Sequence, residues 1–112
     1  MALLVTGFGP FLDHCDNPSA VLAAGCGERV EVLDVSYLGV DEFVSALDPS
    51  SFDSWLALGL AAKSDAMLSE TVGRNKVGPL ADVRGDVYGP GSIEPGGPPL
   101  VAATLWREIE VE

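Results

Sequence analysis

"LLVTGFGPFLDHCDNPS", residues 3–19, decides how this chain begins to fold. Its first residues are apolar, apart from Thr6, up to Gly7, which is typical of a strand buried on both faces of a sheet. Asn17, followed by proline, predicts the start of a helix, because asparagine is a favoured N-cap and proline fits the first turn. The loop between these elements carries Phe8 and Phe11. Aromatic side chains in a loop indicate either packing beneath the loop or a binding role.

The next elements alternate in the same way. Strands that are buried on both faces and alternate with helices predict a parallel α/β sheet. The pattern predicts strands at 2–8, 29–38 (with a bulge or phase slip) and 54–61, and helices at 18–26 and 41–47, the second capped by Asp41.

The segment "DAMLSETVGRN", residues 65–75, fits either a strand or a helix. With a period of two, Glu70 shares a face with three apolar side chains. In a helix, Glu70 would instead form an i, i+4 ion pair with Arg74. We favour the strand, because Thr71 and Gly73 weaken a helix.

Residues 77–99 contain six glycines and five prolines and therefore predict a long loop, which is usually functional or poorly ordered. The periodicity of residues 99–109 predicts a helix after it. We find neither an internal repeat nor a second domain, so residues 1–112 are interpreted as a single domain or a domain fragment.

The composition excludes several classes of protein. The net charge of −11 argues against nucleic acids and anionic membrane surfaces as partners. The apolar runs are too short to span a bilayer, and the start resembles no secretory signal. Two cysteines do not make a disulfide scaffold. We therefore expect a cytoplasmic protein, and its 47% hydrophobic content suggests apolar surface meant for another subunit or for missing chain.

The first loop offers two possible sites, one for a dinucleotide and one for a metal, and the sequence argues against both. A dinucleotide loop would need glycine at position 12, which is Leu12, and Pro10 lacks the N–H that a phosphate would use. The run Asp13–Asp16 holds four potential metal ligands, but adjacent residues rarely point at one ion, and no second ligand pair follows at zinc spacing. We interpret it as a solvated polar loop and expect no metal and no cofactor.

Glu70 has two interpretations. A carboxylate on an apolar strand face is costly unless it is paired. It could form a salt bridge to Arg74 or Arg84. Alternatively, it could orient a histidine as the third member of a catalytic triad.

Several motifs together resemble the pyroglutamyl peptidase I (pyrrolidone-carboxylate peptidase) family. "VTGFGPF" and "NPS" are similar to its amino-terminal signature, T-G-F-x-P-F followed by N-P-[ST]. "GLA" at 59–61 resembles the family's G-[LQ]-A loop. Glu70 and Asn75 match the spacing of its E-R-x-A-x-N segment. "PGGPP" at 95–99 resembles its P-G-A-P region, so the matches cover the amino-terminal half of such an enzyme.

The resemblance implies a cysteine peptidase that removes an amino-terminal pyroglutamyl residue from peptides. It implies a three-layer α/β/α sandwich with a mostly parallel sheet, cytoplasmic location and a homo-oligomer, commonly a tetramer. The triad is Cys, His and Glu, and its glutamate matches Glu70. Phe8 and Phe11 would hold the flat lactam ring, while Leu60 would sit in a loop whose backbone contacts that ring. Apolar walls suit such an uncharged cyclic amide.

Some positions depart from the family pattern. Its usual Gly-Gly is Leu12-Asp13 here, and the arginine of its D-A-R-x-P-D-N block has only Arg84 as a loose counterpart. The nucleophile and histidine lie in the family's later half, and neither Cys15 nor Cys26 matches the nucleophile's motif. We therefore expect the 112 residues alone to be inactive without a carboxy-terminal segment or companion chain. The alternative is a non-catalytic binding or assembly module with the same fold.

Overall fold

A computed structural model describes residues 2–26 and 29–102 of the chain. The chain forms two compact units. The sheet unit comprises residues 1–60 and 81–86, and the hairpin unit comprises residues 61–80 and 87–112. Within residues 2–26 and 29–102, no helix is both long and apolar enough to cross a membrane.

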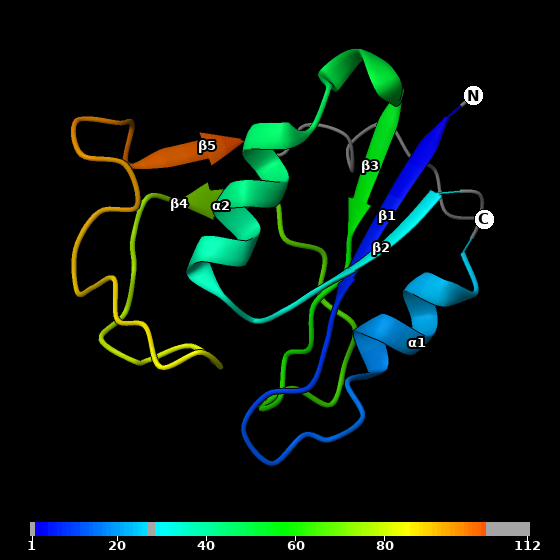
Figure 1. Ribbon diagram of the computed structural model, residues 1–112, viewed down its shortest axis with the longest axis horizontal. Helices are drawn as coiled ribbons and strands as arrows, with labels where there is room; N and C mark the ends of the chain where they lie inside the picture. The colour runs from blue at the N-terminus through cyan, green and yellow to red at the C-terminus, as the bar shows by residue number, and fades with distance from the viewer. Residues whose placement is uncertain (1, 27–28, 103–112) are drawn as a thin grey trace. The chain divides into compact units, whose positions relative to one another are not determined.

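The sheet unit is built on three parallel strands in the order β2-β1-β3 (Figure 1). The central strand β1 is the most buried, with Leu4 and Val5 fully inaccessible to solvent. This confirms the parallel α/β sheet predicted from the alternation of apolar strands and helices. The elements, in chain order, are β1 (Leu3–Phe8), α1 (Pro18–Ala24), β2 (Arg29–Leu33), α2 (Tyr37–Ala46), a short 3-10 helix η1 (Pro49–Ser51) and β3 (Ser54–Ala57).

The two helices cover opposite faces of the sheet. Residues of β1 alternate between the faces, so Gly7 points to one face and Thr6 to the other. Gly7 lies against the first turn of α1. On the Thr6 face, the indole Nε1–H of Trp55 donates to Thr6 Oγ1 at 3.0 Å, and Phe43 of α2 meets the indole edge-on with ring centroids 6.1 Å apart. The result is a helix–sheet–helix arrangement, which confirms the predicted three-layer class.

Helix α1 begins as the sequence predicts. Asn17 is the N-cap, and its side chain accepts a hydrogen bond from the backbone N–H of Ser19. The helix ends at Ala24, two residues before the predicted end. Strand β3 is likewise shorter than predicted and ends at Ala57.

Helix α2 corrects two predictions. The strand predicted over 29–38 stops at Leu33, and the predicted cap Asp41 lies inside the helix. Ser36 is the true N-cap, and its hydroxyl accepts from the backbone N–H of Gly39 at 3.0 Å. The apolar alternation that suggested a longer strand therefore continues into the first turn of a helix.

The hairpin unit contains two short antiparallel strands, β4 (Val72–Arg74) and β5 (Leu100–Ala102). The strand predicted over 65–75 forms only at β4. The helix predicted over 99–109 is wrong at β5, because these residues pair with β4, and 103–109 lie outside the described residues.

Between β4 and β5 the chain has neither helix nor strand, apart from a single bridge between Val77 and Gly91. The Asn75 side chain ties the base of this segment to Glu94: its Nδ2 donates to the Glu94 carbonyl and its Oδ1 accepts from the Glu94 N–H, each at 2.8 Å.

Candidate active site

Phe8 is the last residue of the central strand, and the aromatic loop (residues 8–11) follows at the carboxyl end of the sheet. In open α/β sheets, ligands bind outside the carboxyl ends of the strands. Phe8 and Phe11 are both half-buried, and the backbone N–H of Gly9 donates to the Leu33 carbonyl at 2.8 Å. The loop is therefore anchored to the end of β2, at the edge of the sheet where this class of fold places its ligands.

Asn17 and Ser19 hold the aromatic loop from the side of α1. The Ser19 hydroxyl accepts a hydrogen bond from the Phe8 N–H at 2.9 Å, and Asn17 Nδ2 donates to the Gly9 carbonyl at 3.0 Å. The two side chains also bond to each other, with Ser19 Oγ 2.8 Å from Asn17 Oδ1. Each residue is only 3% exposed. The N-P-S motif is thus joined physically to the T-G-F motif.

The close approach of α1 explains why the first motif has glycine at position 7. A Cβ at this position would collide with the backbone carbonyl of Ser19 and would lie 3.1 Å from the Ala20 Cα. Real Cβ atoms do not approach backbone so closely, so only glycine lets α1 lie directly against β1 at this point.

The aromatic loop ends in a tight turn over residues 11–14. Phe11 and His14 exchange backbone hydrogen bonds, and their rings stack at an angle with centroids 5.2 Å apart. Leu12, at the tip of the turn, has a φ of 52° and is 87% exposed. This is the left-handed region that glycine prefers. Protonated His14 would also pair with Asp13, whose carboxylate lies 3.7 Å from His14 Nε2.

Leu60 follows β3 at the same end of the sheet as Phe8. The N–H of Leu58 donates to the Thr6 carbonyl at 2.8 Å, so the chain beyond β3 still runs beside β1. Leu60 comes two residues later and is half-buried. The structure therefore brings the segments of Phe8 and Leu60 to neighbouring strand ends.

Glu70 lies in the hairpin unit, two residues before β4, and is exposed. The prediction that it sits on an apolar strand face is wrong, because residues 65–71 form no strand. The predicted salt bridge is also absent from the described part of the chain: Arg84 pairs with Asp34 at 3.1 Å, and Glu70 and Arg74 form no ion pair. The carboxylate of Glu70 is thus open to solvent.

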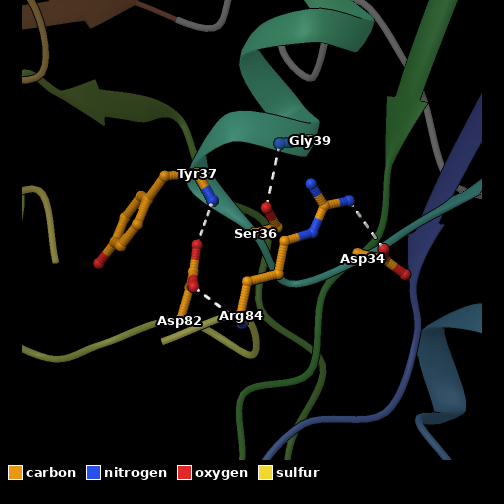
Figure 2. Close-up of polar contacts among 6 residues, drawn as sticks. All are labelled: Asp34, Ser36, Tyr37, Gly39, Asp82 and Arg84. Atoms are coloured by element: carbon orange, nitrogen blue, oxygen red, sulfur yellow. Dashed lines mark hydrogen bonds and ion pairs between the residues drawn. The ribbon is translucent and has the colours of Figure 1, made fainter. Parts of the chain in front are cut away.

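Asp82, which the sequence motifs did not single out, anchors residues 81–86 to the start of α2. Its carboxylate accepts the Tyr37 N–H at 2.8 Å and the Arg84 N–H at 2.9 Å (Figure 2). It also accepts the Asp86 N–H at 2.9 Å. Burial raises the pKa of Asp82, but these backbone donors and the Arg84 guanidinium outweigh it and hold the pKa below its usual value. The sequence signal for this anchor is Asp82-Val83-Arg84. It could not be interpreted without knowing that α2 begins at Tyr37, whose N–H the Asp82 carboxylate accepts.

The described residues offer few other groups for a metal, nucleophile or ligand site. They hold no cluster of three or more His, Cys, Asp or Glu side chains fit for a metal ion. Cys15 and Cys26 are free and exposed. The described part of the hairpin unit contains an open, mostly apolar cavity of about 270 Å³, lined in part by Arg74, Ile93 and Val101.

The fold and the anchored loop define a parallel three-layer α/β/α protein with a candidate site at the carboxyl end of its central strand. The chain is 33% identical to the pyrrolidone-carboxylate peptidase of Deinococcus radiodurans, across 97% of this chain and 59% of that protein. No protein-family model matches the chain.

Solved structures show the same similarity to pyrrolidone carboxyl peptidases. The pyrrolidone carboxyl peptidase of Thermus thermophilus matches with a TM-score of 0.79 and 32% identity, covering 95% of this chain and 64% of that one. That of Thermococcus litoralis matches with a TM-score of 0.81 and 27% identity, covering 94% and 53%. The resemblance predicted from the motifs is confirmed: the chain has the fold of pyrrolidone carboxyl peptidases and corresponds to their amino-terminal part. It spans less than two thirds of these relatives' length.

Proposed function

We propose that this chain forms the substrate-binding part of a cysteine peptidase that removes amino-terminal pyroglutamyl residues from peptides. The observation that carries the proposal is the aromatic loop, which is held at the carboxyl end of the central strand by the N-P-S motif. Phe8 and Phe11 would provide apolar walls for the flat lactam ring, and the backbone around Leu60 would contact its edge. An uncharged cyclic amide suits such a pocket.

In this proposal Glu70 is the carboxylate of the triad. A carboxylate that accepts from an imidazole N–H fixes its tautomer and stabilises its charged form, so that the histidine can take a proton from the cysteine thiol. The thiolate attacks the pyroglutamyl carbonyl, the histidine protonates the leaving amine, and water then releases pyroglutamate. In the described chain the Glu70 carboxylate is solvent-exposed, so it is accessible to an imidazole from another segment.

The 112 residues contain neither the family's nucleophile motif nor its histidine motif. By themselves they should therefore not turn over substrate. The assay is release of a fluorophore from a pyroglutamyl conjugate. Thiol-inhibitor-sensitive release by the 112-residue chain alone would refute this part of the proposal.

A chimaera tests the function directly. This chain would replace the matching amino-terminal part of the Deinococcus radiodurans peptidase, which leaves the remainder of that protein unchanged. We expect the chimaera to release the fluorophore, whereas a folded but inactive chimaera would overturn the peptidase assignment.

A non-catalytic binding or assembly module is the second candidate, and the exposed apolar surface of the chain favours it. Large apolar side chains are exposed, among them Met67 at 93% and Leu80 at 75%. Such surface supports the expected homo-oligomer or cover by a companion segment. Sedimentation of the 112-residue chain over a range of concentrations separates self-association from cover by a companion segment: a concentration-dependent increase in mass indicates self-association, and a constant monomer mass excludes it.

A further inference from the structure

We infer that Asn17 and Ser19 are positioning residues: through the backbone of Phe8 and Gly9, they set where the two aromatic rings of the loop lie. This inference rests on the proposed function, in which those rings hold the pyroglutamyl group. It adds a role for the N-P-S motif beyond starting a helix.

The hydrogen bonds of Asn17 exceed what a helix cap requires. An N-cap needs one side-chain oxygen that accepts from an N–H of the first turn, and Asn17 Oδ1 does this with Ser19 at 3.0 Å. Its Nδ2 makes a further bond to the Gly9 carbonyl, eight residues earlier in the chain. Because Asn17 is 3% exposed, water cannot easily replace that donor.

The aromatic loop has few polar groups left for a ligand. The N–H of Phe8 donates to Ser19 Oγ, that of Gly9 to the Leu33 carbonyl, and that of Phe11 to the His14 carbonyl. The remaining residue, Pro10, has no N–H. A ligand at this loop would therefore be held by contact with the rings, so ring position governs affinity. The hydrogen bonds from Asn17 and Ser19 fix the backbone that carries the rings.

Substitutions at Asn17 can separate the two roles. N17S keeps a good N-cap oxygen but is too short to reach Gly9. N17D also keeps the cap, and it replaces the donor to Gly9 with a carboxylate oxygen that repels the carbonyl. N17A removes both roles and serves as the control for loss of the cap.

The test is nuclear magnetic resonance on the 112-residue chain with labelled phenylalanine, in titrations with L-pyroglutamyl amide. For N17S and N17D we expect unchanged exchange protection of the α1 amides, displaced signals of the Phe8 and Phe11 rings, and a Kd at least tenfold weaker than that of the unsubstituted chain. Ring signals and a Kd within twofold of that chain in both variants would overturn the inference.

The ring signals keep the two proposals distinguishable. If the unsubstituted chain does not bind the amide, the proposed function loses its pocket. The positioning role is then decided by the rings alone: displaced signals in N17S and N17D support it, and unchanged signals refute it.

Discussion

The backbone N–H of Tyr37 donates a 2.8 Å hydrogen bond to the carboxylate of Asp82, 45 residues further along the chain. Tyr37 is the first residue of α2, and Ser36 caps the same turn. A carboxylate at this end of a helix is also favoured by the helix dipole. The segment 81–86 is thereby fixed to the sheet unit, with a further bond from the Val83 N–H to the Val35 carbonyl at 3.1 Å. Figure 2 shows how the Asp82 carboxylate meets the start of the helix.

The first prediction concerns pH. Because the pKa of Asp82 is lowered in the folded chain, its contribution to stability is complete above its usual value of 3.8 and is lost as pH falls through the lowered folded value. We expect D82N to lower the thermal midpoint at pH 7, and we expect the difference from the unsubstituted chain to shrink below pH 3.8. Thermal unfolding followed by circular dichroism from pH 7 down to pH 3 measures this difference.

Two details sharpen the pH test. The pKa of Asp48 is also lowered, chiefly by the Ser50 hydroxyl, so the unsubstituted chain loses stability in the same pH range and only the difference between variants isolates Asp82. D86N is the matched control, since the described residues make no hydrogen bond or ion pair with that side chain. A midpoint for D82N equal to that of D86N at pH 7 contradicts the anchoring role.

A second prediction concerns the contact between β1 and α1. G7A places a methyl group into the backbone of Ser19, and neither element can move freely. We expect a loss of about 3 kcal/mol in the free energy of unfolding, which is the upper part of the usual range for overpacking. G59A is the control, because a Cβ there meets nothing within 4 Å. Urea unfolding should show G59A within about 1 kcal/mol of the unsubstituted chain, and equal losses for the two variants would disprove the close contact.

A third prediction concerns the turn after Phe11. Leu12 has a φ of 52°, in a region that costs a non-glycine residue about 1 kcal/mol or more. L12G should stabilise the chain by about 0.5–1 kcal/mol, since the gain is reduced by the greater freedom of glycine in the unfolded state. L12A keeps the Cβ and should bring no such gain. If urea unfolding finds L12G less stable than L12A, the left-handed turn is wrong.

A fourth prediction concerns the hydrogen bond between Trp55 and Thr6. The Thr6 side chain is buried, so W55F leaves its hydroxyl without the indole donor and should cost about 1–2 kcal/mol. A double-mutant cycle with T6V isolates this bond from the ring contacts of Trp55 with Phe43 and Phe52. We expect a coupling energy of about 1 kcal/mol from urea unfolding, and strictly additive effects would show that the bond contributes nothing.

Local signals explain the elements that the sequence predicted well. β1 begins with an apolar run followed closely by glycine, and α1 has its cap and its proline in adjacent positions. Each of these signals acts within a few residues, and in these elements the tertiary contacts agree with it. The aromatic loop could be predicted for the same reason, because its signal lies within a few residues of sequence.

The corrected elements depend on distant partners. Asp41 was predicted as the cap of α2, whereas Ser36 is the cap, and Asp82, which supports a start at Tyr37, is remote in sequence. Leu100–Ala102 has helical periodicity but pairs with Val72–Arg74, and periodicity carries no information about such a partner. The same lack of a local signal affects Glu70: its predicted face required a strand at that position, but β4 begins only two residues later, at Val72.

The activity of the chimaera with a substitution at Glu70 tests the central claim most directly. We expect E70Q to lower kcat/KM for the pyroglutamyl conjugate by about 10² to 10⁴, the range for losing the carboxylate that orients a catalytic histidine. D65N, which alters another exposed acid of the same segment, should stay within about twofold because no role is assigned to it. Full activity of E70Q, or an equal loss in D65N, would contradict the assignment of Glu70 to a pyroglutamyl peptidase triad.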